Sequence, residues 1–159
     1  MMRMVAAING EHLAKLGFGH GNTVQVSCIT CHRGQDRPLT LGQRLMDTIE
    51  SGGVQAGVED YQRLCEQDYG RGKFDFGEGS LNALGYRRLF GGRTIDAIVI
   101  IELNVAQCPD AANPHDSLGE AYMQAGRRAE AIASYRRSLV LNPDNNNAED
   151  RLRALNAGE

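Results

Sequence analysis

Two cysteines three positions apart, followed directly by a histidine, are the residues of this sequence best suited to chemistry. Cys28, Cys31 and His32 lie in the segment VSCITCHRGQ, which has the form CxxCH. This spacing serves three kinds of site: covalent attachment of haem, one half of a zinc site, or a redox-active dithiol. Each gives the chain a different cofactor, so the other cysteines and the expected secondary structure must discriminate among them.

The surroundings of the motif weigh against zinc and against a dithiol. A structural zinc site normally adds a second close pair of ligands, but Cys65 and Cys108 each stand alone in expected helices, where we predict small buried hydrophobes. A thioredoxin-like dithiol needs a βαβ setting, and after TVQVS nearly every apolar pattern has helical spacing. The spacing therefore favours covalent haem, with a vacant motif or a dithiol as the alternative.

A haem at this motif needs ligands on both sides of the iron. Two intervening residues let both sulfurs reach the vinyl groups on one haem edge, and His32 then becomes the proximal ligand. Met1 and Met4 share one face of the expected first helix with Ile8, so either methionine is a candidate for the distal ligand. His20, in the Gly-rich turn GFGHGNT, is the reserve candidate.

The first 38 residues resemble a known family. The segments MMRMVAAINGEHL, GFGHGNT and VSCITCHRG together look like one haem-binding segment of the cytochrome subunit of photosynthetic reaction centres, where a Met-bearing helix ending in Ile-Asn leads into a CxxCHRG turn. The resemblance implies covalent haem c on Cys28 and Cys31, His32 as proximal ligand, and Met4 or Met1 as distal ligand. Well-known members carry the segment four times and this chain carries it once, so the resemblance implies electron transfer and leaves photosynthesis open.

The second half of the chain repeats itself every 34 residues. LNALGYRRLFGGRTIDAIVIIELNVAQCPD aligns with HDSLGEAYMQAGRRAEAIASYRRSLVLNPD, and the matched pairs are Leu84 with Leu118, Gly85 with Gly119, Ala97 with Ala131, Ile101 with Tyr135, and Pro109 with Pro143. This period and the L-G, A, F/Y, P pattern match the tetratricopeptide repeat, in which two antiparallel helices meet where small residues allow close approach. The clear repeats cover about residues 81–114 and 115–148.

Flanking segments extend this array, because two repeats alone are fewer than a stable stack usually needs. Residues 39–50 and 54–67 are expected to form two helices separated by SGG, and the closing segment NNNAEDRLRAL is expected to form a capping helix with Asn145 or Asn146 as its N-cap. We therefore predict an all-α protein with a haem-binding segment at residues 1–38 and a tetratricopeptide-like region at residues 39–157.

Composition limits the partners that the chain can have. The net charge is −3 with no basic face, which argues against nucleic acid. Hydrolase, zinc-protease, Walker and Rossmann motifs are absent, so we predict no enzyme activity. The expected partners are redox proteins and proteins or peptides docked on the repeat surface, and one candidate surface consists of Arg87, Arg88, Arg127, Arg128, Arg136 and Arg137.

The motif also bears on the compartment. Haem c is attached outside the cytoplasm, so a CxxCH protein of this kind is expected to be periplasmic or exported. The longest wholly apolar run is AIVII, which is too short to span a bilayer. We therefore expect the reading frame to continue upstream of Met1 with an export signal or lipoprotein anchor, and we leave room for association with a membrane complex.

Overall fold

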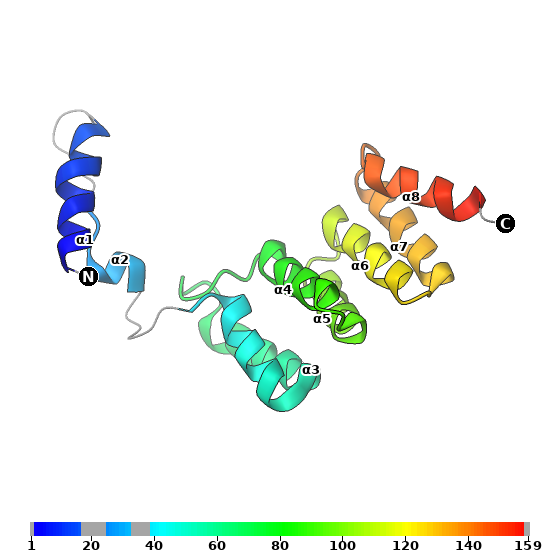
Figure 1. The fold of residues 1–159 in the computed structure, drawn as a ribbon, viewed down its shortest axis with the longest axis horizontal. Coiled ribbons are helices and arrows are strands. Elements are labelled where there is room, and N and C mark those ends of the chain that lie inside the picture. Colours follow the sequence, from blue (N-terminus) through cyan, green and yellow to red (C-terminus); the bar gives the residue numbers. More distant parts are fainter. Residues whose placement is uncertain (1, 17–24, 33–38, 158–159) are drawn as a thin grey trace. The chain divides into compact units, whose positions relative to one another are not determined.

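The computed structural model describes residues 2–16, 25–32 and 39–157, and all regular structure in those residues is helical. The chain forms two compact units, residues 1–39 and residues 40–159. The prediction of an all-α protein with helical hairpins is confirmed. In chain order the elements are α1 (Met2–Ala7), η1 (Ile8–His12), η2 (Leu13–Leu16), α2 (Cys28–His32), α3 (Leu41–Asp68), α4 (Glu78–Phe90), α5 (Thr94–Gln107), α6 (Ala112–Gln124), α7 (Arg128–Leu141) and α8 (Asn146–Ala157) (Figure 1).

The first unit contains one helical run and one short helix. The run changes its winding along its length: α1 is α-helical, η1 is a π-helical turn and η2 is a 3₁₀ turn. A single π-helical turn inside a longer helix is often found at functional sites, because it re-aims the side chains that it carries. The CxxCH motif forms α2, a single helical turn that lies beside α1 (Figure 1).

The second unit begins with α3, which contains a kink. Thr40 caps the helix by accepting a hydrogen bond from the Gln43 amide at 3.2 Å, and the Gln43 side chain accepts one from the Thr40 amide at 2.9 Å. Gly53 has φ 84°, a left-handed conformation that ends the first half of α3 and begins the second. The kink lies within the predicted SGG break, so α3 is two helices packed as a hairpin.

The two hairpins that follow are built alike, as the 34-residue period predicts. Helix α4 pairs with α5, and α6 pairs with α7 (Figure 1). Gly92 (φ 74°) ends α4 and Gly126 (φ 72°) ends α6, each in the left-handed conformation that closes a helix C-terminus. In each repeat a side chain late in the second helix donates to a carbonyl early in the first: Asn104 to Glu78 at 2.9 Å, and Ser138 to Ala112 at 2.9 Å.

Close contacts within the hairpins occur at glycine. A Cβ at Gly85 would lie 2.5 Å from Cγ1 of Ile101, and a Cβ at Gly119 would lie 2.7 Å from the ring of Tyr135. Real Cβ atoms do not approach so closely, so these two positions need glycine for the paired helices to meet. Each small residue therefore accommodates the large residue 16 positions later, and the same contact recurs after 34 residues.

Helix α5 joins two hydrophobic cores. Its residues Ala97, Ile98 and Ile101 pack with α6 and α7, whereas Ile100 packs with α3 and α4. A helix that is apolar on two sides is buried on two sides, which accounts for the run AIVII. None of the helices in the described residues has the length and apolar content needed to cross a bilayer.

Candidate functional site

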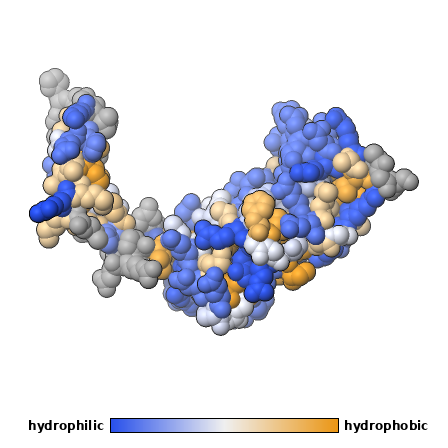
Figure 2. All heavy atoms as spheres, in the orientation of Figure 1, coloured by the Kyte–Doolittle hydropathy of each residue, from blue (hydrophilic) through white to orange (hydrophobic). Residues whose placement is uncertain are grey.

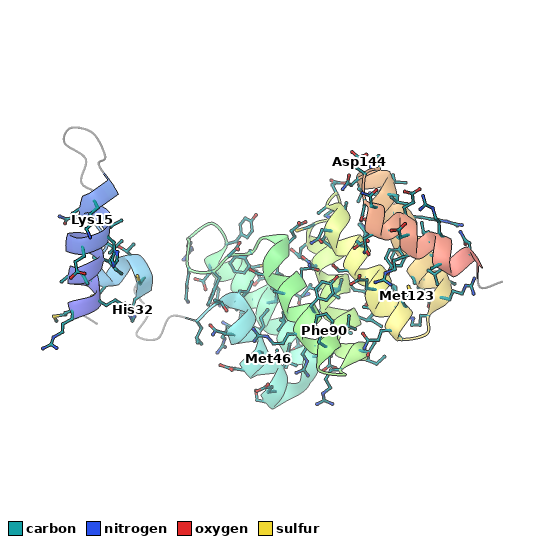
Figure 3. The ribbon with its side chains drawn as sticks, turned by 45° about the horizontal axis from the view of Figure 1, so that its top comes forward. Lys15, His32, Met46, Phe90, Met123 and Asp144 are labelled. Atoms are coloured by element: carbon teal, nitrogen blue, oxygen red, sulfur yellow. The ribbon has the colours of Figure 1, made fainter. Side chains whose placement is uncertain are left out.

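The CxxCH motif presents its three candidate ligands from a single helical turn. Cys28 and Cys31 are exposed free thiols in α2, and the next residue, His32, is half-buried (Figure 3). Positions i and i+3 of a helix lie on the same face, so both sulfurs are directed to one side of the turn. An arrangement of this kind offers two thiols for covalent attachment and an imidazole beside them.

Ser27 fixes the start of this turn. Its amide donates to Oγ1 of Thr30 at 2.9 Å, and the Thr30 amide lies 3.4 Å from Oγ of Ser27, so the two residues exchange side chain to backbone hydrogen bonds. A reciprocal cap of this kind satisfies amides that the helix start leaves free. The Ser27 and Thr30 side chains therefore help a helix of only five residues to hold its shape around the cysteines.

Asn9 holds the segment before the motif against the first helical run. Its side-chain Nδ2 donates to the carbonyl of Val26 at 2.7 Å, and the amide of Val26 donates to Asn9 Oδ1 at 2.8 Å. One side chain thus pairs both backbone groups of a residue 17 positions away. The sequence predicted Asn9 only as the end of a helix. It did not indicate that the Asn9 side chain joins two segments by hydrogen bonds.

The distal-ligand candidates differ in what the structure says of them. Met4 lies in α1 and is 54% exposed, so its sulfur is not committed to a core. Met4 lies shortly before Asn9 in the chain, and the CxxCH turn follows Val26 directly. The hydrogen bonds between Asn9 and Val26 therefore join the segment with Met4 to the segment with the motif, and Figure 1 shows α2 beside α1. Met1 and His20 lie outside the described residues.

The remaining cysteines lie in the second unit. Cys65 is half-buried in α3, and Cys108 is half-buried at the C-terminal cap of α5, one residue beyond the helix. Burial, with a smaller contribution from the charge of Glu78, raises the pKa of the Cys108 thiol. Within the described residues no three Cys, His, Asp or Glu side chains are placed to hold a metal ion.

A second candidate site is a groove in the repeat unit, formed where α4, α6, α7 and α8 come together. A cavity of about 450 Å³ there is lined by Leu89, Phe90, Glu120, Met123, Gln124, Tyr135 and Arg151. Phe90 is 82% exposed, and its ring stacks on that of Tyr86 with centroids 5.6 Å apart. Phe90 ends α4 and Met123 lies near the end of α6 (Figure 3). The lining combines apolar and charged groups, as ligand pockets usually do.

Hydrogen bonds to two carboxylates connect the helices around the groove. Tyr86 donates to Glu120 at 2.6 Å, which joins equivalent positions of the two repeats. Asn147, on α8, donates to Asp116 at 2.8 Å. Burial and the bond to Glu120 raise the pKa of Tyr86 to about 12, so its hydroxyl remains a donor at neutral pH.

Three of the six arginines that the sequence suggested as one partner surface are engaged locally, while Arg87, Arg136 and Arg137 are exposed. Arg88 is only 12% exposed and pairs with Asp96 at 2.5 Å, so its assignment to a free surface is wrong. Arg127 pairs with Glu130 at 2.9 Å and its guanidinium stacks over the ring of Tyr122. Arg128 donates to the carbonyl of Leu155. Residues of the groove, which the sequence did not single out, are the better candidates.

Comparisons with known proteins place the second unit among helical repeats. The tetratricopeptide repeat family model matches residues 112–145, which include α6 and α7. Two solved structures share 18% sequence identity with this chain at a TM-score of 0.52: the first TPR domain of human RPAP3, and the first TPR of Spaghetti (RPAP3) bound to the HSP90 peptide SRMEEVD. Each comparison covers 74% of this chain, with 87% of the first structure and 89% of the second. The search of curated proteins found no match.

Proposed function

We propose that residues 40–157 form a protein-interaction module that binds a peptide segment of a partner in the groove between α4, α6 and α8. The observation that carries this proposal is the groove itself, a cavity of about 450 Å³ with an aromatic side chain, Phe90, left 82% exposed at its edge. Exposed aromatic side chains next to a pocket are the usual anchors of protein interfaces. One of the structural neighbours is itself described as bound to a peptide, which supports the same use of the fold here.

Panning a displayed random-peptide library against the full chain tests this proposal. We expect selected peptides to bind wild type and to lose at least about tenfold in affinity with Phe90→Ser, because truncating an interface aromatic typically costs ~2 kcal/mol or more. The matched control is Ile95→Ser, which removes another large exposed apolar side chain, 66% exposed, from α5. Peptides that bind Phe90→Ser as tightly as wild type would place the binding site elsewhere and refute the proposal.

We also propose that the first unit carries one covalent haem c and that the chain passes electrons to protein redox partners. The observation that favours this second function is the arrangement of α2, where two exposed free thiols and a half-buried imidazole share one turn. Cys28 and Cys31 would form the thioethers, His32 would bind the iron on the proximal side, and Met4 or Met1 on the distal side. When bound, haem supplies one-electron chemistry.

The residues of the first unit would position that group. The Asn9 bonds to Val26 hold the CxxCH turn close to the run that carries Met4, and the Ser27–Thr30 exchange keeps the turn helical. A thioether ligand opposite histidine raises the reduction potential, which suits an electron carrier. Because haem c is attached outside the cytoplasm, this second proposal includes an exported or periplasmic location.

Production of the chain with a cytochrome c maturation system tests the haem proposal. We expect a visible haem spectrum that survives acid-acetone extraction, a reduced holo-protein yield for Cys28→Ala, Cys31→Ala and His32→Ala, and no change for the controls Cys65→Ala and Cys108→Ala. Met4→His should lower the reduction potential if Met4 is the distal ligand. A protein without a Soret band under these conditions would instead support a repeat scaffold with a vacant CxxCH or a redox dithiol.

A further inference from the structure

The groove of the repeat unit carries an excess of negative charge. Asp116 and Glu120 lie four residues apart on α6, so their carboxylates share one face of the helix. The side chain of Asn147 reaches both: its Nδ2 lies 2.8 Å from Asp116 Oδ2 and 3.5 Å from Glu120 Oε1. Glu120 lines the groove and Asp116 does not, but both carboxylates contact the same amide, so the charge of Asp116 adds to that of Glu120 close to this wall.

The partners of these carboxylates neutralise only part of that charge. Asp116 accepts from the side chains of Asn145 at 3.1 Å and Asn147 at 2.8 Å, and both donors are uncharged. Arg151 is the cation that lines the cavity, and its guanidinium lies 3.9 Å from Glu120 Oε1. Two carboxylates and one guanidinium leave about one negative charge.

The protonation behaviour of the groove agrees with this count. Burial raises the pKa of Asp116, hydrogen bonds from Asn147 and Asn145 lower it in part, and the charge of Glu120 raises it further. Burial also raises the pKa of Tyr135, with the charges of Glu120 and Asp116 adding to the effect. Burial disfavours a charge of either sign, so only the charge effects agree with the count: Glu120 raises the pKa of Asp116, and both carboxylates raise that of Tyr135, with Arg151 partly opposing them.

The apolar part of the groove adjoins these charges. Leu89 and Phe90 come from α4, and Met123 from α6 lies three residues after Glu120. On the face shown in Figure 2 the surface is mostly hydrophilic, with small separate apolar patches. A partner in the groove therefore finds an aromatic ring, Phe90, and a flexible thioether, Met123, in the same lining as the Glu120 carboxylate.

Building on the proposed peptide binding, we propose that the groove selects a partner segment in which a lysine or arginine lies next to a large apolar side chain, and that it disfavours acidic tails. The cation would pair with the Glu120 carboxylate, with the nearby charge of Asp116 adding to the attraction, while the apolar side chain would pack on Phe90 and Met123. The peptide SRMEEVD, bound to one structural neighbour, has three acidic residues to one arginine. An acidic peptide in this groove would meet the Glu120 carboxylate with Asp116 close by, and the arginine of the lining, Arg151, is already beside Glu120.

Fluorescence anisotropy with matched peptides tests the charge preference. The probes are labelled heptapeptides that differ only in whether a central phenylalanine is flanked by lysines or by glutamates, together with SRMEEVD. We expect the lysine peptide to bind at least about tenfold tighter than the glutamate peptide at low salt, and this preference to shrink as potassium chloride is raised. SRMEEVD should bind no better than the glutamate peptide.

Variants of the full chain separate groove charge from overall charge. Glu120→Gln keeps an oxygen that can accept from Tyr86, and we expect it to weaken lysine-peptide binding about threefold to fivefold and to strengthen glutamate-peptide binding. The control Glu149→Gln removes the same charge from α8, where Glu149 is 51% exposed and pairs with Arg153. It should leave both affinities unchanged. Circular dichroism checks that each variant is folded.

The outcomes distinguish this inference from the proposal on which it rests. If the glutamate peptide or SRMEEVD binds as tightly as the lysine peptide, or if Glu149→Gln has the same effect as Glu120→Gln, the charge preference is overturned while peptide binding stands. If Phe90→Ser leaves the binding of every peptide unchanged, or if none binds, peptide docking in this groove is itself overturned.

Discussion

The contact between Gly119 and Tyr135 gives the sharpest test of the repeat packing. A Cβ at position 119 would lie 2.7 Å from Cε1 and 2.8 Å from both Cδ1 and Cζ of the Tyr135 ring, where ordinary carbon contacts are ~3.5–4.0 Å. Tyr135 has no exposed surface and belongs to the core cluster of the repeats, so moving its ring away from an added Cβ would disturb its core contacts. Overpacking costs ~1–3 kcal/mol, and the better helix propensity of alanine returns up to ~1 kcal/mol. We expect Gly119→Ala to lose about 1–2 kcal/mol.

Urea unfolding followed by circular dichroism measures this loss. With a denaturant dependence of about 2 kcal/mol per molar, the midpoint should fall by about 0.5–1 M. Gly79→Ala in α4 is the control, because its added Cβ has no neighbour within 4 Å, and it should be neutral or slightly stabilising. Gly85→Ala should also lose stability, since its added Cβ would lie 2.5 Å from Cγ1 of Ile101, a buried β-branched side chain. A midpoint for Gly119→Ala at or above that of wild type would refute this account of the hairpin.

Three further perturbations test other contacts. Asp60→Asn should lower the free energy of unfolding by about 1–3 kcal/mol near pH 7. Burial alone would raise the pKa of Asp60, but hydrogen bonds from Thr48, Arg63 and Arg44 lower it overall. The stability that ionised Asp60 contributes is therefore present above the unfolded pKa of ~3.9, and urea melts should show its loss as the pH falls through the lower folded pKa. Ala131→Leu fills a site with no exposed surface, and a thermal melt should show a loss of ~1–3 kcal/mol. Asn9→Ala removes both bonds to Val26, and amide exchange at Val26 should then accelerate; unchanged exchange would show that Asn9 does not hold the segment.

The sequence predicted the repeat unit well because its packing is periodic. Gly126 ends α6 as expected, and Asn145 is the N-cap of α8, its Oδ1 accepting from the Ala148 amide at 3.2 Å. These features are local, so residue type alone indicates them. The sequence predicts the close contact between Gly119 and Ala131, but the atoms nearest to an added Cβ at Gly119 belong to Tyr135, one turn further along the same helix as Ala131. Only the three-dimensional register decides which side chain meets the glycine.

Contacts that are neither repeated nor local could not be predicted from the sequence. The Asn9 bonds to Val26 join segments 17 residues apart and have no counterpart in a repeat. The burial of Arg88 depends on Asp96 and on Met46, whose sulfur lies 3.5 Å from the Arg88 guanidinium and belongs to another hairpin. Charge at the groove arises from two helices as well, since Glu120 on α6 lies 3.9 Å from Arg151 on α8. An amphipathic pattern reports which face is buried, and it carries no information about such pairings.

The two repeats are more alike in structure than their residue identities indicate. The family model matches only residues 112–145, yet residues 78–111 form the same hairpin, with Asn104 donating to the Glu78 carbonyl where Ser138 donates to the Ala112 carbonyl, both at 2.9 Å. The Asn104 amide and the Ser138 hydroxyl differ in size, and a sequence comparison scores them as different residues. Each nevertheless donates to a carbonyl at the start of the first helix of its hairpin. The hydrogen bond occurs at the same place in both hairpins although the side chain that donates it differs, so the geometry is periodic where the residues are not. Hairpins held by equivalent bonds can carry different side chains at equivalent positions of the groove lining, as Phe90 and Gln124 do.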